Sequence, residues 1–508
     1  MAPPRASNEP RQRSPPVAPL VLGTDVASER HVVIPPSADR FHAAVFGSTG
    51  AGKSMLAHSV ALQQIVNRGG GVGVIDPHAD LAFGILSYLV AHGYFRDPTA
   101  FDSLVYIDFS EDAFLPFNVL RQPHLSAYAT AETVMEALVR TFPDLEGGAP
   151  LFRTLFLASA VTLIANGLPL TCLYPLLIDI DFRHRCLQKV TDPLVLQTFA
   201  HYDRARGGVE AQAGSALRRA FLLTFSPIAR FTLGQTENRL DMRSFMDSGR
   251  SLLLNLGSIP DSRTQRLLSS LSMTFLEQAA LSRAQLPPQA RKPWLCLVDE
   301  WPVVCARQPE TLGRILETSR KYGLILWLLG QHAGQLTAAR LSGALEQART
   351  TILFRLGPES AGALAPHVAS IDPYRVKSPA RTLSQRDIYM SAGEQRAQWE
   401  QRLQELPVRQ AVVKIHGQET TQLRTLAVAT TAPDPDELAE VLAEYHRRYQ
   451  RSRSEAEATT MQVLERAGVS PGILSSTPYG STTPDTDTLL DFDAFFGEDP
   501  VADARSID

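Results

Sequence analysis

The sequence predicts an α/β fold in which a mainly parallel sheet is covered by helices and interrupted by an inserted, all-helical subdomain. Short apolar runs alternate with helical patterns over residues 41–109 and again over residues 251–356. Such alternation is typical of parallel strands joined by crossover helices. Between these two stretches, residues 125–225 have helical periodicity. We therefore expect one core whose strands come from both sides of a helical insertion.

The first stretch provides three strands and a helix. We expect strands at Phe41–Phe46, Val72–Ile75 and Leu104–Phe109, because each is a short, largely apolar run. Lys53–Asn67 is expected to form a helix, which Gly69-Gly70 closes.

The insertion is predicted to hold four helices, since apolar residues recur at helical spacing in each. The ranges are Ala129–Phe142, Leu151–Ala165, Asp192–Tyr202 and Ala211–Phe225. Residues 154–180 are the most apolar stretch of the chain, but Asn166, Gly167, Pro169 and Pro175 interrupt them. Because a spanning helix needs about 20 mostly apolar residues, we expect a buried helix pair here and no transmembrane segment.

Alternation of strands and helices resumes after the insertion. Strands are expected at Ser251–Leu256, Trp294–Val298, Leu324–Leu329 and Thr351–Leu356, and helices at Gln265–Ser282 and Pro309–Tyr322. A last strand pair is expected at Gln410–Ile415 and Leu423–Val428. A charged helix begins near Asp434-Pro435, where Asp suits the N-cap and Pro the first helical position.

These elements divide the chain into six parts. We predict a disordered Pro/Arg-rich arm (1–20), the first part of an NTPase core (21–124), the helical insertion (125–230), the second part of the core (231–430), a charged helix (431–469) and a disordered acidic tail (470–508). The two ends hold too few apolar side chains to offset the entropy of ordering.

Composition is that of a soluble protein. Hydrophobic residues make up 44% and charged residues 20% of the 508 positions. Residues 471–508 hold eight acidic side chains and one Arg, so the remainder is slightly basic, with 48 basic and 45 acidic residues. The N-terminus has no apolar signal core. Cys172, Cys186, Cys296 and Cys305 are widely spaced, which predicts reduced thiols in a cytoplasmic protein.

A phosphate-binding loop is the strongest motif. Residues 47–54 read Gly47-Ser48-Thr49-Gly50-Ala51-Gly52-Lys53-Ser54. The glycines let successive backbone N–H groups turn toward one anion, while Lys53 adds a positive charge and Ser54 a hydroxyl ligand for Mg²⁺. The strand before and the helix after the loop place the phosphates at a helix N-terminus. The motif therefore predicts a P-loop NTPase that binds ATP with Mg²⁺.

An acidic pair follows a later strand, in Leu295-Cys296-Leu297-Val298-Asp299-Glu300. Asp299 is expected to hold Mg²⁺, partly through water, and Glu300 to polarise the attacking water. An apolar run that ends in acids is often only a strand meeting a loop, so this assignment depends on the phosphate loop. Together the two motifs predict an ATP hydrolase.

Four further segments, in order, resemble the HerA/FtsK superfamily of ring ATPases and, within it, the TraG/TraD-like type IV coupling proteins of conjugation and secretion. The segments are Asp39-Arg40-Phe41-His42, Asp76-Pro77-His78-Ala79-Asp80-Leu81, Thr318-Ser319-Arg320-Lys321-Tyr322-Gly323 with the following strand and Gly330-Gln331, and Leu353-Phe354-Arg355-Leu356-Gly357. The resemblance covers about residues 21–430. The chain departs from the family at Ala79, where Gly is usual and could take a positive φ that Ala resists.

The resemblance implies a RecA-like core that forms a homo-hexameric ring, with ATP bound between neighbouring subunits and DNA as the moved partner. An arginine near the subunit edge can then stabilise the transition-state charge at the next subunit's ATP, and we choose Arg320, with Arg355 as the competitor. Gln331 is expected to hydrogen-bond the γ-phosphate or the attacking water. Coupling proteins commonly carry N-terminal membrane helices, whereas this chain has the Pro/Arg-rich arm, so membrane recruitment is expected to need a partner such as a relaxase or a secretion-channel protein.

Three other features leave alternatives open. Asp76, His78 and Asp80 do not form a structural zinc pattern, and they either shape the nucleotide pocket or make local turn hydrogen bonds. Two arginine clusters either contact DNA phosphates or are only solvated; they are Arg204, Arg206, Arg218 and Arg219 in the insertion, and Arg447, Arg448, Arg451 and Arg453 in the late helix. The apolar cluster at residues 489–496 of the tail either folds onto a partner or lies in an inert tail.

The leading functional prediction is a DNA-translocating ATPase of conjugation or type IV secretion. One alternative is a HerA-like helicase or translocase that serves DNA-end processing or defence. A second is an ATP-binding scaffold without productive turnover, against which the intact Lys53, Asp299 and Glu300 argue.

Overall fold

The computed structural model describes residues 18–35, 40–68, 71–110, 112–142, 150–204, 220–221, 223–304, 315–333, 347–378, 388–429 and 431–469. Several predictions fall outside these residues: the arm up to residue 17, the acidic tail with its apolar cluster, most of the helix at Ala211–Phe225, the first part of Pro309–Tyr322, and Asp39, Cys305, Arg206, Arg218 and Arg219.

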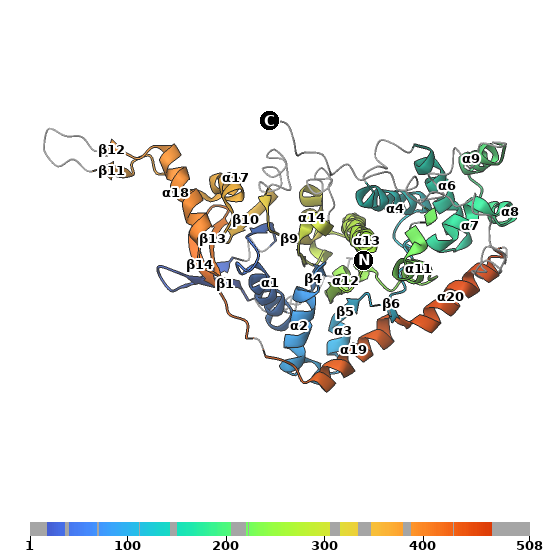
Figure 1. The fold of residues 1–508 in the computed structure, drawn as a ribbon, viewed down its shortest axis with the longest axis horizontal. Helices are drawn as coiled ribbons and strands as arrows, with labels where there is room; N and C mark the ends of the chain where they lie inside the picture. The colour runs from blue at the N-terminus through green and yellow to red at the C-terminus, as the bar shows by residue number, and fades with distance from the viewer. Residues whose placement is uncertain are drawn as a thin grey trace, which may run out of the picture.

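One large sheet organises the molecule (Figure 1). Its eleven strands lie in the order β2-β1-β14-β13-β10-β3-β9-β8-β4-β7-β5. The last seven in this order run parallel: β10 (Ala348–Leu353), β3 (His42–Phe46), β9 (Leu324–Gly330), β8 (Trp294–Val298), β4 (Val72–Asp76), β7 (Ser251–Asn255) and β5 (Leu104–Asp108). The α/β prediction with a mainly parallel sheet is thus confirmed.

Antiparallel strands extend one side of the sheet. They are β1 (Leu20–Asp25), β2 (His31–Ile34), β13 (Gln410–Ile415) and β14 (Thr421–Thr425). The sequence reading missed β1 and β2, and also a separate short hairpin of β11 (Val376–Ser378) and β12 (Ile388–Tyr389). It placed β10 three residues late, at Thr351–Leu356, and β14 two residues late, at Leu423–Val428, because apolar residues continue beyond the ladder hydrogen bonds.

Helices cover both faces of the parallel strands. The first part of the core contributes α1 (Lys53–Leu62), which continues as a π-helical turn (Gln63–Asn67), then α2 (Asp80–Ala91) and α3 (Ala100–Ser103). The second part contributes α13 (Ser262–Ser282), α14 (Trp301–Val304), α17 (Pro358–Val368) and α18 (Ala392–Glu405). Along β8, Trp294, Cys296 and Val298 belong to the core on one face, and Leu295 and Leu297 to the core on the other.

Between β6 (Ala113–Phe114) and β7 the chain is helical. The helices are α4 (Ala127–Thr141), α6 (Pro150–Asn166), α7 (Leu173–Ile178), α8 (Ile180–Leu187), α9 (Pro193–Arg204), α11 (Pro227–Leu233) and α12 (Met242–Ser248). Their buried side chains, such as Leu138 and Phe156, belong to the same apolar core as Ile75 and Leu252 of the sheet. The helical region therefore shares its apolar core with the sheet, and α4 packs against α13.

The late charged segment is two helices where one was predicted. α19 (Pro435–Tyr449) begins as expected, with the Asp434 side chain accepting hydrogen bonds from the backbone N–H groups of Asp436 and Glu437. Its break comes at Gln450, whose amide donates to the carbonyl oxygens of Asp108 and Ala113. β15 (Arg451–Ser452) then pairs with β6, and α20 (Arg453–Arg466) follows. Figure 1 shows α19 along the core and α20 along the helical region.

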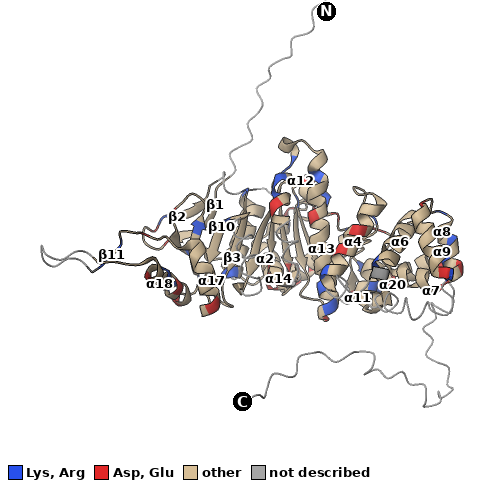
Figure 2. Ribbon diagram, turned by 90° about the horizontal axis from the view of Figure 1, so that it is seen from above, with Lys and Arg blue, Asp and Glu red and all other residues tan. Residues whose placement is uncertain are grey.

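Charged residues lie mostly on helices and loops, whereas the strands are mostly apolar (Figure 2). No helix among the described residues is long and apolar enough to cross a membrane. Cys172, Cys186 and Cys296 are buried, and Cys172 and Cys186 are free thiols.

Candidate functional site

The phosphate loop lies between the end of β3 and the start of α1. Gly50 has a φ of 72° and Gly52 a φ of 120°, values that residues with a Cβ adopt at a cost. No side chain caps the N-terminus of α1. The first N–H groups of the helix therefore stay available for an anion, as the sequence predicts.

Lys53 points back over the loop. Its side chain is 7% exposed, and its Nζ donates to the carbonyl oxygens of Gly47 at 2.6 Å and Ser48 at 3.3 Å. Burial lowers the pKa of Lys53, while the carboxylates of Glu300 and Asp299 act in the opposite direction. The ammonium group is thus held by hydrogen bonds to the loop backbone, close enough to Asp299 and Glu300 to interact with their charges.

Strand ends on either side hold the loop in place. The N–H of Gly47 donates to the carbonyl oxygen of Gly330 at 3.2 Å, and that of Ser48 to the carbonyl oxygen of Arg355 at 2.8 Å. The hydroxyl of Thr49 donates to Oε1 of Gln331 at 3.0 Å. The structure thus places Gln331 directly against the phosphate loop.

Arg409 is a loop neighbour that the sequence reading missed. It precedes β13, has a φ of 66°, and its N–H donates to the carbonyl oxygen of Ala51 at 2.9 Å. A Cβ on Gly52 would stand 3.1 Å from its Cα. No motif in the sequence marks this contact, because it joins residues more than 350 positions apart.

The acidic pair lies at the end of β8, at the same edge of the sheet. Asp299 and Glu300 are 7% and 6% exposed. Burial, then the nearby carboxylates of Asp76 and Glu300, raise the pKa of Asp299 to about 6. Glu300 has a φ of 40°, a strained conformation for a residue with a side chain, and such strain clusters at functional sites.

Asp76 forms local turn hydrogen bonds and also adjoins the acidic pair. It is fully buried, and its carboxylate accepts the N–H groups of His78 and Ala82, each at 2.8 Å. Burial raises its pKa, and these hydrogen bonds lower it. The structure therefore shows the local turn hydrogen bonds, and a part of this segment in shaping the nucleotide pocket stays a prediction. His78 and Asp80 are exposed.

Ala79 adopts the backbone conformation for which the family resemblance implies glycine. Its φ is 73°, in the left-handed region, at the N-cap of α2. The departure from Gly therefore leaves the turn intact, at a steric cost of about 1–2 kcal/mol for an L-residue.

The carboxylates fit a magnesium ion. The carboxylates of Asp76 and Glu300 help to raise the pKa of Asp299, and a divalent cation would relieve this repulsion. No group of three or more His, Cys, Asp or Glu side chains in the described part of the chain is arranged to hold a metal by itself. This suits Mg²⁺, which takes one or two protein ligands, waters and the substrate's phosphates. Asp299 and Ser54, which is exposed, stay the residues that we predict would hold it.

The two candidate arginines lie at opposite edges of the parallel strands. Arg355 follows β10 and contacts the phosphate loop of its own chain through its carbonyl oxygen. Arg320 lies in a 3₁₀ turn (Ser319–Tyr322) before β9, and its guanidinium stacks on the ring of Phe41 at 4.2 Å. The ring also contacts Arg349 at 4.0 Å. Since β9 has seven residues, Arg320 lies about 20 Å from the edge that holds the loop.

The arginines of the late cluster are largely used inside the chain. Arg447 and Arg448 both pair with Glu444, Arg448 also with Asp102, and Arg451 with Glu237. These ion pairs favour a structural use of this cluster over contact with DNA phosphates. Of the other cluster only Arg204, at the end of α9, lies within the described residues.

Comparisons with known proteins agree with this fold. Residues 25–87 match a family model described as the central domain of the helicase HerA. The bacterial conjugative coupling protein TrwBdeltaN70 is 16% identical, with a TM-score of 0.52 over 81% of this chain and 91% of that one. The plasmid coupling protein TrwB in complex with ADP and Mg²⁺ is 14% identical, with a TM-score of 0.52 over 83% of this chain and 98% of that one.

VirB4 of Thermoanaerobacter pseudethanolicus is 13% identical, with a TM-score of 0.47 over 82% of this chain and 97% of that one. No curated protein matches the chain. The HerA match over residues 25–87 agrees with the predicted resemblance to the HerA/FtsK superfamily, and the chain shares its fold with the coupling protein TrwB.

Proposed function

We propose that this chain is an ATP-driven DNA translocase of conjugation or type IV secretion that works as a hexameric ring. The observation that carries the proposal is that Lys53, Asp299, Glu300 and Gln331, predicted from separate segments, meet at one edge of the parallel sheet. The fold shared with a coupling protein supports the choice of DNA movement among the tasks of P-loop NTPases.

ATP hydrolysis follows from the roles of these residues. The N–H groups at the start of α1 and the ammonium of Lys53 bind the phosphates, and Asp299 and Ser54 hold the Mg²⁺, which neutralises phosphate charge when bound. Glu300 accepts a hydrogen bond from the attacking water, whose oxygen bonds to the γ-phosphorus as the bond to the β,γ-bridging oxygen breaks. Gln331, whose Oε1 accepts a hydrogen bond from the hydroxyl of Thr49, contacts the γ-phosphate in this proposal.

Arg320 acts on a neighbouring subunit in this proposal. It lies at the edge opposite its own phosphate loop, so its own ATP is out of reach of its side chain. An exposed guanidinium on the surface of one subunit can instead enter the nucleotide site of the next. Arg355 adjoins its own loop and stays the competing choice.

The cellular setting belongs to the same proposal. We place the protein in the cytoplasm, with membrane recruitment through a relaxase or a secretion-channel protein. DNA contacts are expected to be with the backbone and therefore strongly dependent on salt.

A DNA-dependent ATPase assay tests the proposal. We expect the parent protein to hydrolyse ATP faster with DNA, and Lys53→Ala and Glu300→Gln each to lower kcat by at least about 100-fold. Lys189→Ala, a change at an exposed lysine away from the loop, is the matched control and should keep the parent rate. If the parent and both site variants hydrolyse equally poorly with and without DNA, the motor proposal fails and the ATP-binding scaffold is favoured.

The match of residues 25–87 to the HerA central domain keeps one alternative in place, a helicase or translocase for DNA-end processing or defence. The genes beside this one discriminate the two. Relaxase and secretion genes support a role in transfer, whereas nuclease genes support end processing.

A further inference from the structure

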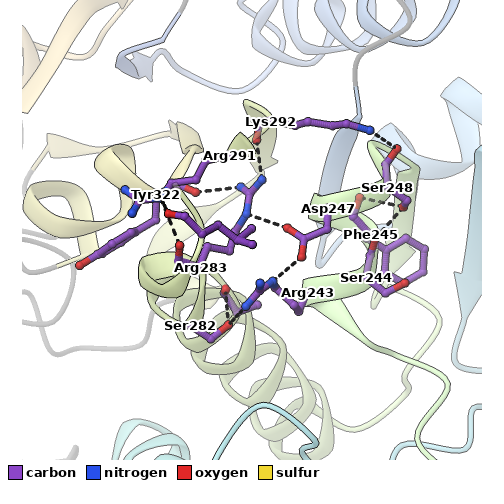
Figure 3. A network of polar contacts seen from close by, with 12 residues as sticks. Arg243, Ser244, Phe245, Asp247, Ser248, Ser282, Arg283, Arg291, Lys292 and Tyr322 are labelled. Atoms are coloured by element: carbon purple, nitrogen blue, oxygen red, sulfur yellow. Dashed lines mark hydrogen bonds and ion pairs between the residues drawn. The ribbon is translucent and has the colours of Figure 1, made fainter. Parts of the chain in front are cut away.

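A buried arginine holds the turn that carries Arg320. Arg283, just after α13, is 0% exposed. Its Nη1 donates to the carbonyl oxygen of Tyr322 at 2.8 Å and its Nη2 to that of Lys292 at 3.0 Å, while its Nε pairs with Asp247 at 2.9 Å. Figure 3 shows this guanidinium between α12, the start of β8 and the turn before β9. One side chain thus joins three segments.

Arg291 fixes the adjoining peptide of the same turn. Its Nη1 donates to the carbonyl oxygen of Lys321 at 2.9 Å, and its guanidinium stacks on the ring of Tyr322 at 5.1 Å. Its Nε donates to the carbonyl oxygens of Arg283 and Leu286. Two consecutive carbonyl oxygens directly after Arg320 are therefore held by arginines.

The backbone after the turn is equally constrained. Gly323 has a φ of 86°, its N–H donates to the carbonyl oxygen of Arg320, and its own carbonyl oxygen accepts the N–H of Trp294. A Cβ at this position would stand 2.8 Å from Nη1 of Arg283 and 2.8 Å from the carbonyl oxygen of Lys292. The path of the chain through residues 320–323 is thus set by β8 and Arg283, while the Arg320 side chain is exposed.

The far end of α13 adjoins the nucleotide edge of the same chain. Gln265, in its first turn, donates to the carbonyl oxygens of Pro77 at 2.7 Å and Leu256 at 3.1 Å. Pro77 follows Asp76, which adjoins Asp299. With 21 residues, α13 is about 30 Å long, and it joins a segment beside the chain's own ATP site to the turn that carries Arg320.

We propose that Arg283 is a positioning residue that holds Arg320 in the geometry needed at the neighbouring subunit's ATP. In this proposal α13 is the rigid element that connects the turn of Arg320 to the chain's own nucleotide site. The inference rests on the proposed function, because it takes Arg320 as the trans arginine. The guanidinium of Arg283 suits this role, because its rigid, planar set of N–H donors can bind two backbone carbonyl oxygens and a carboxylate at once. An apolar residue would fill the same space without orienting the turn.

The physical part of the proposal is tested by amide hydrogen exchange in the full chain. In Arg283→Met we expect the amides of Trp294 and Gly323 to exchange at least about tenfold faster than in the parent. Arg243→Met is the matched control, because Arg243 pairs with the same Asp247 and bonds Ser282, both away from the turn. Unchanged exchange at Trp294 and Gly323 in Arg283→Met overturns the proposal. If Arg283→Met does not fold, Arg291→Met replaces it with the same expectation.

The functional part is tested by a double-variant cycle of ATPase rates with DNA. Arg283→Met should lower kcat by about 10- to 100-fold, the cost of misplacing a catalytic group by about 1 Å, with the KM for ATP within about twofold of the parent. In an Arg320→Ala background the same substitution should have no further effect, because a residue that acts through Arg320 has nothing left to position. Arg283→Lys, which keeps the charge but not the planar set of donors, should recover the melting temperature more than kcat.

The outcomes separate this inference from the proposed function. A parent protein without DNA-stimulated hydrolysis, or an Arg320→Ala variant with the full parent rate, overturns the assignment of the trans arginine and this inference with it. An active parent with a slow Arg320→Ala and a fully active Arg283→Met overturns only the inference. Additive losses in the double variant show a general structural role of Arg283 and also overturn it.

Discussion

His42 on β3 should make the stability of this protein depend on pH between about 4 and 6.5. The ring is 1% exposed and bridges two segments. The N–H of Leu326 donates to Nδ1 at 2.9 Å, so the proton of the neutral ring is on Nε2, which donates to the carbonyl oxygen of Leu316 at 2.9 Å. Protonation of Nδ1 would remove the acceptor of the Leu326 N–H inside the core.

Burial, as the main cause, lowers the pKa of His42 to about 4, with a smaller contribution in the same direction from the charge of Arg320. In the unfolded chain the pKa of histidine is about 6.5. Because the folded pKa is the lower one, the unfolded state takes up the proton first, so stability is fully present above pH 6.5 and is lost as the pH falls toward 4. The loss is about 2 kcal/mol at pH 5 and about 3 kcal/mol once the pH reaches 4.

Calorimetric melting of the parent and of His42→Gln at pH 7.5 and pH 5 measures this loss. The variant should melt lower at pH 7.5, because it loses core packing and hydrogen bonds. The difference in melting temperature between the parent and the variant should be about 2 °C smaller at pH 5 than at pH 7.5. This figure follows from an unfolding entropy of about 1 kcal/mol per kelvin for a unit of this size. Other groups that titrate in this range, such as His58, are common to both proteins and cancel. A difference in melting temperature that is the same at both pH values would refute the reasoning.

Three further substitutions test the fold, each by its change in melting temperature. Ala79→Gly should stabilise the protein by about 0.5–1 kcal/mol, because the left-handed φ of 73° costs Ala more than the added freedom of Gly costs in the unfolded chain; a lower melting temperature contradicts this. Gly73→Ala should destabilise by about 1–3 kcal/mol, since the new Cβ would stand 2.2 Å from Cη2 of Trp294, and trimming the ring with Trp294→Phe should recover part of the loss. Tyr445→Phe should lower the free energy of unfolding by about 1 kcal/mol, because the hydroxyl donates to the buried carbonyl oxygen of Leu104 at 2.8 Å. An unchanged melting temperature would count against a stabilising role of this hydrogen bond.

The elements that the sequence reading placed well are those whose signal is local. The seven parallel strands were recognised because a strand buried on both faces reads as a continuous apolar run, as in Leu295–Val298. The antiparallel strands β1 and β2 were missed, because exposed and half-buried positions such as His31 and Val32 break that signal. The break between α19 and α20 was missed as well, since it depends on hydrogen bonds from Gln450 to residues more than 330 positions away.

The residues of the candidate site likewise fall into those that local sequence signals predicted and those that only the fold brings together. The site's predicted segments after β3, β8 and β9 could be recognised because each follows the end of a parallel strand, and the carboxyl ends of parallel strands meet at one edge. Residues that enter the site from elsewhere had no such signal. Arg409 reaches the phosphate loop from the antiparallel side of the sheet. Asp76 could be singled out from the sequence, but its effect on the pKa of Asp299 could not, because that effect depends on β4 and β8 being neighbours in the sheet.

The sequence by itself determined the phosphate loop and its chemistry, because the glycines at positions 50 and 52, Lys53 and Ser54 act through backbone angles and groups within eight consecutive residues. Only the tertiary structure decided what surrounds that loop: the raised pKa of Asp299, the contact of Gln331 with Thr49, and the hold of Arg283 on the turn of Arg320. The physical reason is that burial and long-range hydrogen bonds depend on which strands become neighbours, and that order is set by the packing of the whole sheet.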